Sequence, residues 1–155
     1  MNKQTGFTLI ELMIVVIVLA IVAAIATPSM QQVIARNAVT SATNDLVTAL
    51  QVGRSQAIRE GSPWIVTVND SNDPWVLVDS ENGGADRARQ FVRNENVEVS
   101  GIGGGLSIEF DARGIPEDGA EEITLSWRSA ERCVSVSPAG RIRSGTAGED
   151  ETCGN

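Results

Sequence analysis

The chain has 155 residues, which is enough for one domain with a modest hydrophobic core. Its formal net charge of −8 argues against a general coat on nucleic acid or anionic membranes, although a small basic patch stays open. The chain has no histidine and two cysteines, which excludes imidazole acid–base catalysis and a zinc site built from these residue types.

The first predicted element is an apolar segment over residues 7–27, in which Glu11 is the single charged side chain. At a helical rise of about 1.5 Å per residue, it reaches roughly 30 Å, the thickness of the hydrocarbon core of a bilayer. An ordinary secretory signal, with Lys3 as its basic part, is one interpretation, but its apolar part would be only about 7–15 residues long. A plain membrane anchor is another, but it leaves Glu11 near hydrocarbon at a cost of about 2.5–3.5 kcal/mol.

Cleavage after Gly6 would explain the carboxylate of Glu11. Phe7 would then carry a new terminal amine, and Glu11 would follow it by one helical turn. The carboxylate could pair with this amine, or with the amine of a neighbouring copy, so that a charge inside the membrane has a partner.

The segment KQTGFTLIEL, with Lys3, Gly6, Phe7 and Glu11, resembles the class III signal of type IV pilins and type II secretion pseudopilins. The resemblance implies that prepilin peptidase removes a leader of residues 1–6 by cutting between Gly6 and Phe7, and that it N-methylates Phe7. It also implies that Glu11 assists assembly by docking against a neighbour's N-terminal amine. The implied location is the inner membrane, as a single-pass protein with its head in the periplasm, followed by incorporation into a pilus or pseudopilus.

One long helix is predicted from Phe7 to Glu60, with a bend at Pro28 and a stop at Gly61. Residues 7–27 would form its transmembrane or filament-core part, and residues 28–61 an amphipathic continuation beneath a head domain. After Pro28, apolar residues three or four apart predict a buried stripe. These residues are Val39, Ala42, Leu46, Ala49, Leu50, Gly53 and Ala57.

Short β-rich runs with turn residues between them fill the head, residues 62–155. Together they predict a small, mainly antiparallel sheet or sandwich. The runs are WIVTV, WVLVD, QFVR, VEVS, LSIEF, ITLSW, CVSVS and GRIRS.

The segment LVTALQVGRSQAIREGSPWIVTV is similar to the helix-to-strand junction of the GspH/FimT family, which contains H-type pseudopilins and FimT/FimU-type minor pilins. Gly53 and Gln56 stand where this family's motif usually has Ala and Glu, and Gly53 lowers helix propensity. The segments DPWVLVDSENGG, SIEFDARG and CVSVSPAGRIR also resemble the family. The resemblance implies an α+β, pilin-like lollipop fold, in which a long N-terminal helix carries a small β-rich head.

No arrangement of side chains predicts catalysis, and neither an enzyme activity nor a cofactor is expected. Paired carboxylates such as Glu121 and Glu122 are typical of a solvated face. The acidic loop from Asp79 to Asp86 does not fit the calcium-binding spacing, because Gly83 stands where a ligand is needed. No metal site is therefore predicted.

Cys133 and Cys153 would be free thiols in a reducing compartment and would pair in an exported domain, closing a loop near the C-terminus. This loop would hold Arg141 and Arg143, which are two residues apart and would project from the same face of a strand. Arg128 and Arg132 on nearby segments could join them.

Four guanidinium groups would form a patch able to contact phosphates. The motif Gly-Arg-x-Arg resembles a C-terminal motif of FimT-type minor pilins, and this implies DNA capture during natural transformation. The alternative is that these arginines pair with nearby carboxylates. The available carboxylates are Glu131, Glu149, Asp150 and Glu151.

Three functions therefore stay open. The chain could be a structural minor pilin that primes pilus assembly, an H-type pseudopilin of type II secretion, or a DNA receptor that uses Arg141 and Arg143. The implied partners are prepilin peptidase, other pilins or pseudopilins, the inner membrane and, in the third case, DNA.

Overall fold

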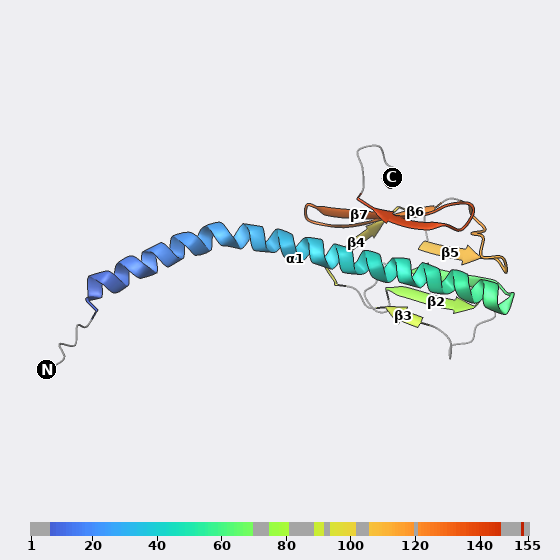
Figure 1. The fold of residues 1–155 in the computed structure, drawn as a ribbon, viewed down its shortest axis with the longest axis horizontal. Coiled ribbons are helices and arrows are strands. Elements are labelled where there is room, and N and C mark those ends of the chain that lie inside the picture. The colour runs from blue at the N-terminus through green and yellow to red at the C-terminus, as the bar shows by residue number, and fades with distance from the viewer. Residues whose placement is uncertain are drawn as a thin grey trace. The chain divides into compact units, whose positions relative to one another are not determined.

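The computed structural model describes residues 7–69, 75–80, 89–91, 94–101, 106–119, 121–146 and 153. In this part of the chain, one long helix precedes eight strands (Figure 1). The elements are α1 (Leu9–Glu60), β1 (Trp64–Val68), β2 (Val76–Ser80), β3 (Arg89–Phe91), β4 (Glu98–Ser100), β5 (Leu106–Phe110), β6 (Glu121–Trp127), β7 (Ala130–Val136) and β8 (Ile142–Gly145). The chain divides into two compact units, residues 1–34 and residues 35–155, and α1 contributes to both.

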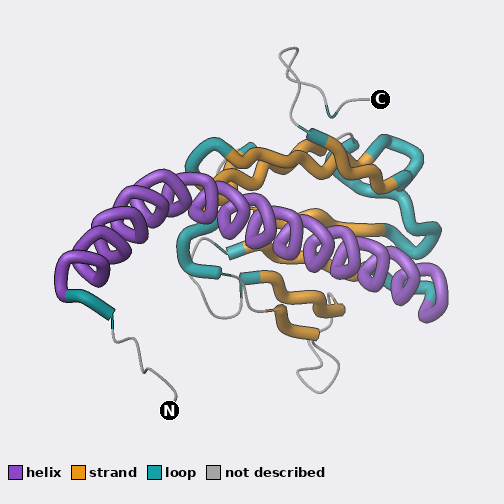
Figure 2. Tube along the Cα trace, turned by 60° about the vertical axis from the view of Figure 1, so that its left-hand side comes forward, coloured by secondary structure: helices purple, strands orange, loops and turns teal. Residues whose placement is uncertain are grey.

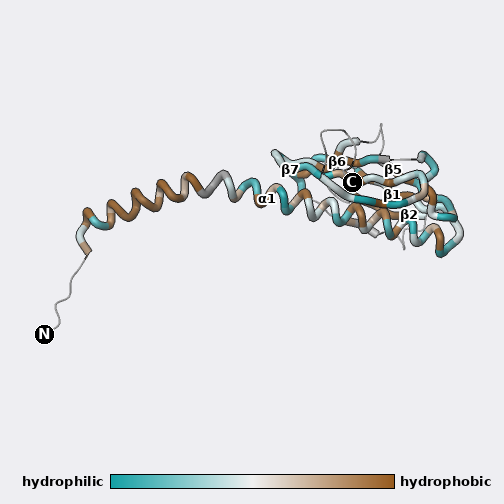
Figure 3. Tube along the Cα trace, turned by 45° about the horizontal axis from the view of Figure 1, so that its top comes forward, coloured by the Kyte–Doolittle hydropathy of each residue, from teal (hydrophilic) through white to brown (hydrophobic). Residues whose placement is uncertain are grey.

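In the first unit, α1 is apolar on every side from Leu12 to Ile25. Figure 3 shows an almost continuous hydrophobic colour along this part of the helix. The large apolar side chains from Phe7 to Ile34 are between 47% and 86% exposed. By its length and composition, α1 contains a stretch that can cross a membrane.

In the second unit, α1 buries one stripe of small and aliphatic residues, and this confirms the predicted stripe. Its positions, all buried, are Val39, Ala42, Leu46, Ala49, Leu50, Gly53 and Ala57. Thr43 lies beside the stripe and is 1% exposed, and its hydroxyl donates a hydrogen bond to the Val39 carbonyl at 2.7 Å. The helix ends at Glu60 as predicted, and Gly61 follows with a φ of 64°, a conformation that glycine adopts without strain.

Gly53 marks a very close approach between α1 and the first sheet. A Cβ atom at this position would lie 2.6 Å from Cγ2 of Val66 on β1 and 3.5 Å from Cγ1 of Val78 on β2. A methyl group would therefore require a shift of the stiff, β-branched Val66 side chain. The sequence indicates only that Gly53 weakens the helix. The structure shows why glycine is present here, since a larger residue would not fit against Val66.

The strands form two four-stranded antiparallel sheets with the orders β3-β2-β1-β5 and β4-β6-β7-β8. Each predicted run overlaps one of these strands, with bounds that differ by no more than three residues. In the first sheet, Val66 lies in register with Val78 on one side and Ile108 on the other, and all three are at most 2% exposed. The prediction of a long helix followed by antiparallel sheets is confirmed.

Both sheets and the second half of α1 share one hydrophobic core. Figure 2 shows this half of the helix running across the two sheets. Trp64, Trp75 and Phe110 are the largest of the fully buried side chains. The shared core fixes the edge strand β8 against β7, and so it positions the turns that carry the candidate functional residues.

Candidate functional site

The N-terminal end of α1 is closed by reciprocal hydrogen bonds. The Glu11 backbone N–H donates to Thr8 Oγ1 at 3.3 Å, and the Thr8 N–H donates to Glu11 Oε2 at 3.4 Å. This capping box makes Thr8 the N-cap, so the helix begins at Leu9 rather than at the predicted Phe7. Phe7 precedes the helix and is 86% exposed, and Gly6 lies outside the described residues. The predicted cleavage, methylation and assembly roles of Gly6, Phe7 and Glu11 stay predictions.

Arg141 is positioned by the turn between β7 and β8. The Ser137 N–H donates to the Arg141 carbonyl at 2.9 Å, and the Arg141 N–H donates to Ser137 Oγ at 3.1 Å. Gly140, with a φ of 73°, completes the turn by donating its N–H to the Ser137 carbonyl at 2.7 Å. Arg141 therefore belongs to the turn, whereas Arg143 lies within β8, so the predicted strand does not contain both.

Arg141 and Arg54 line one groove of about 320 Å³ between α1 and the start of β8. The residues that line this groove, named here the Arg54–Arg141 groove, are Gln51, Arg54, Ser55, Ile58, Arg141 and Ile142. Arg54 Nε donates to the Gly114 carbonyl at 3.0 Å, and its Nη2 donates to the Ala139 carbonyl at 3.5 Å. Arg54 thus ties the helix to a loop of each sheet.

The Gly114 carbonyl that accepts from Arg54 lies in a turn organised by Asp111. Asp111 Oδ1 accepts the backbone N–H groups of Ile115 at 2.9 Å and Arg113 at 2.8 Å, and Oδ2 accepts Arg113 Nε at 2.8 Å. The pKa of Asp111 lies below its ordinary value, chiefly because of the bond from the Ile115 N–H. Burial opposes this effect in part, and the bonds from Arg113 add to it.

The four arginines predicted to form one patch are not gathered in the structure. Arg128 lies in the two-residue turn between β6 and β7, with its guanidinium carbon 5.8 Å from the centre of the Trp127 ring. Arg141 lies beyond the other end of the seven-residue strand β7, and therefore roughly 20 Å away along the strand.

Arg132 and Arg143 lie on opposite faces of the second sheet. Arg143 is in register with Ser135, three positions from Arg132 on β7, and an odd separation changes the face. Arg132 instead lines a second groove, also of about 320 Å³, together with Arg36 of α1. Glu131 lines this groove too, but no ion pair between described residues joins it to either arginine. The other carboxylates expected near the arginines, at positions 149–151, lie outside the described residues.

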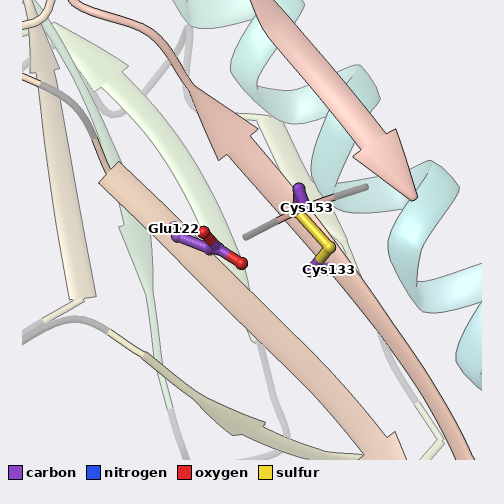
Figure 4. A group of neighbouring side chains, drawn as sticks. All are labelled: Glu122, Cys133 and Cys153. Atoms are coloured by element: carbon purple, nitrogen blue, oxygen red, sulfur yellow. A yellow bond between two sulfur atoms is a disulfide. The ribbon is translucent and has the colours of Figure 1, made fainter. Parts of the chain in front are cut away.

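Cys133 on β7 and Cys153 are joined by a disulfide, with their Cα atoms 5.6 Å apart (Figure 4). The cross-link closes a loop that contains β8 and both Arg141 and Arg143. Glu122 on β6 lies beside it, with a carboxylate oxygen and the two sulfur atoms within 4.8 Å of one another. Because each sulfur is bonded to the other, neither supplies a thiolate, and the group serves as a cross-link in this structure.

Sequence reasoning did not single out Arg54 or Arg36 as functional residues. The signal for Arg54 was its spacing, because it follows the buried Leu50 by four residues and so lies at the edge of the stripe. The sequence gives no such signal for Arg36. This residue is exposed, and Arg132, which lines the same groove, comes from a strand that is distant in the sequence.

Comparison with known families assigns both parts of the chain. The prokaryotic N-terminal methylation motif matches residues 1–27, and the family model of the type II transport protein GspH matches residues 42–140, more than half of the chain. The chain belongs to the GspH family of pilin-like proteins. The predicted family resemblance is therefore confirmed.

The chain is also similar to fimbrial proteins and to a solved structure. A fimbrial protein of Moraxella nonliquefaciens is 35% identical over 117 residues, 76% of this chain and 73% of that protein. A fimbrial protein of Pseudomonas aeruginosa is 52% identical over 61 residues, so the chain spans about two-fifths (39%) of its length. The crystal structure of the Pseudomonas aeruginosa type IV minor pilin FimU has a TM-score of 0.58 at 21% identity, over 70% of this chain and 88% of that chain, and it shares the fold.

Family membership also bears on the role of the N-terminal part of the chain. The methylation motif and the apolar first part of α1 together indicate a membrane-anchored pilin.

Proposed function

We propose that this GspH-family chain is a minor subunit of a type IV filament machine, in pilus biogenesis or in type II secretion. Prepilin peptidase cuts between Gly6 and Phe7 and methylates Phe7. Residues 7–27 then hold the subunit in the inner membrane, while residues 28–61 support a periplasmic head of residues 62–155, until the subunit enters a pilus or pseudopilus. The subunit performs no catalytic step.

The apolar surface of the first part of α1 carries this proposal. Its large side chains, from Phe7 to Ile34, are at least 47% exposed in the isolated chain. Burial of apolar surface is worth about 25 cal/mol per Å², so lipid tails or neighbouring helices must cover this surface. In the membrane or in a filament, the carboxylate of Glu11 requires a partner, and the amine of a processed neighbour provides one.

The separation of the arginines supports an assembly role over DNA capture. Binding to a phosphate backbone needs several cations on one surface, because each neutralised phosphate releases counterions. Arg128, Arg132 and Arg141 belong to different turns and grooves, and Arg143 lies on the opposite face of the sheet from Arg132.

Replacement of Glu11 by leucine in the native bacterium tests the proposal. We expect the Glu11→Leu chain to be cut and methylated like the wild type but to be absent from sheared surface filaments or pseudopili. Glu60→Gln, an exposed change at the end of the same helix, is the matched control and should assemble normally. Mass spectrometry of the mature N-terminus and immunoblots of the filament fraction measure the two steps.

Different results would separate the alternatives. An ordinary secretory signal, cut after the small-residue site at Ala24 to Ala26, would leave a mature N-terminus at Thr27. That N-terminus, or normal incorporation of Glu11→Leu, would contradict the proposed function. Loss of pili in a deletion strain assigns the subunit to a pilus, and loss of protein secretion assigns it to a secretion machine. Loss of DNA uptake with intact pili would instead favour a DNA receptor.

A further inference from the structure

The Arg54–Arg141 groove combines cations with aliphatic side chains. On α1, Gln51, Arg54, Ser55 and Ile58 occupy positions i, i+3, i+4 and i+7, so they form one strip along the helix. The β7–β8 turn and the start of β8 supply the opposite wall. No carboxylate is present among the described residues that line the groove, although the chain as a whole carries a net charge of −8.

Both arginines of the groove have unused hydrogen-bonding capacity. Arg54 has five N–H donors, and two of them donate hydrogen bonds to the Gly114 and Ala139 carbonyls. These bonds hold its guanidinium in place. Arg141 is exposed, and no ion pair among the described residues involves its side chain. Such donors bind a carboxylate or a phosphate specifically, through paired N–H bonds.

Ile58 gives the groove an apolar part. It is 52% exposed, and the other large apolar side chains of similar exposure all lie between Phe7 and Ile34, in the first unit. Among the described residues of the second unit, Ile58 is therefore the one large apolar side chain that is mostly exposed. It lies in the same groove as Ile142. A ligand of this groove gains from an aliphatic group beside its negative charge.

We propose that the Arg54–Arg141 groove docks a segment of a neighbouring filament subunit, one that presents a carboxylate beside an aliphatic side chain. The proposal rests on the function proposed above. A protein fits better than a nucleic acid, because the groove offers two cations and aliphatic contacts. Sites for single-stranded nucleic acid instead combine a basic track with aromatic side chains on which bases stack.

Photo-crosslinking of the full chain in the native bacterium tests this docking. Benzoylphenylalanine replaces the exposed groove residue Gln51, and the matched control carries it at Ser41, exposed on the same helix but outside the groove. We expect position 51 to form a cross-link to another pilin or pseudopilin, mapped by mass spectrometry to a segment with an acidic residue. Arg141→Glu should lower this yield by about tenfold, because it replaces an attractive pair by a repulsive one. Arg143→Glu, the same change two residues away, should not.

A compensating substitution makes the test independent of any folding defect in Arg141→Glu. Changing the acidic residue of the cross-linked segment to arginine should restore the cross-link to the Arg141→Glu chain. If the wild-type chain enters filaments but position 51 yields no subunit cross-link, or yields a cross-link to nucleic acid, the docking proposal is wrong while the proposed function stands. If the wild-type chain never enters filaments, the proposed function itself is wrong.

Discussion

Asp111 holds, through one carboxylate, the turn that presents the Gly114 carbonyl to Arg54. Its pKa is lower in the folded chain than in the unfolded chain, so its contribution to stability is complete above about pH 4 and is lost as the pH falls through the lowered pKa. We expect Asp111→Asn to be less stable than the wild type at neutral pH, and the difference between the two to shrink below about pH 4. Urea unfolding, followed by circular dichroism across this range, measures it.

Asp118→Asn is the control for this pH dependence. Asp118 is exposed in the following loop, and it makes no hydrogen bond with a described residue. Its substitution should leave stability unchanged at each pH. A difference between Asp111→Asn and the wild type that does not vary with pH would contradict the assigned role.

The sequence predicts the roles and contacts of single residues to different extents. The roles predicted for Phe7 and Glu11 depend on spacing within one short segment, and they stay predictions. The role of Arg54 is not predictable from the sequence, because the carbonyls that it contacts belong to residues 60 and 85 positions away along the chain. Gly53 is an intermediate case, since its cost to the helix is visible in the sequence but its contact with Val66 is not.

At the scale of elements, the β7–β8 turn depends on Gly140. A Cβ atom at this position would collide with the Gly114 carbonyl oxygen and approach Arg54 Nε to 3.0 Å, in addition to the strain of a φ of 73°. Gly119 has a φ of 89° but open space around it, so it isolates the conformational term. We expect Gly119→Ala to cost about 1 kcal/mol of unfolding free energy and Gly140→Ala about 2–3 kcal/mol. Urea unfolding of both variants measures the two losses of unfolding free energy. Equal losses would show that the collision at position 140 does not contribute.

The elements themselves were predictable, but their pairing was only partly so. Alternating apolar residues and turn residues located every strand in the described part of the chain, because these signals are local. The separation of the four arginines was not predictable in this way. It depends on the register of β7 with β8, which puts Arg143 opposite Ser135, and on the turn that leaves Arg141 outside the strand.

At the scale of the whole molecule, the fold of the second unit, residues 35–155, should be independent of the apolar part of α1. The buried core begins at Ala35, and residues 1–34 form a separate unit. We expect a chain that begins at Ala35 to unfold cooperatively with the free energy of the full chain, within about 0.5 kcal/mol. Thermal and urea unfolding, compared with the full chain in detergent, measure this.

A longer truncation is the matched control for this independence. A chain that begins at Val47 lacks Ala35, Val39, Ala42 and Leu46, all of which are buried in the core. It should not fold cooperatively, since truncation of a buried leucine such as Leu46 already costs about 2–5 kcal/mol. A large loss of stability already in the chain that begins at Ala35 would show that the first unit supports the head.

The buried stripe of α1 also determines how the head bears a mechanical load. Its core residues extend from Ala35 to Ala57, about 33 Å along the helix axis. A pull along α1 therefore acts in shear on many interlocked side chains at once, and on the two hydrogen bonds of Arg54 with them. A pull that lifted one end of the helix would instead break these contacts one after another, at a much lower force. We therefore expect a subunit that is drawn along its helix axis to keep its head folded.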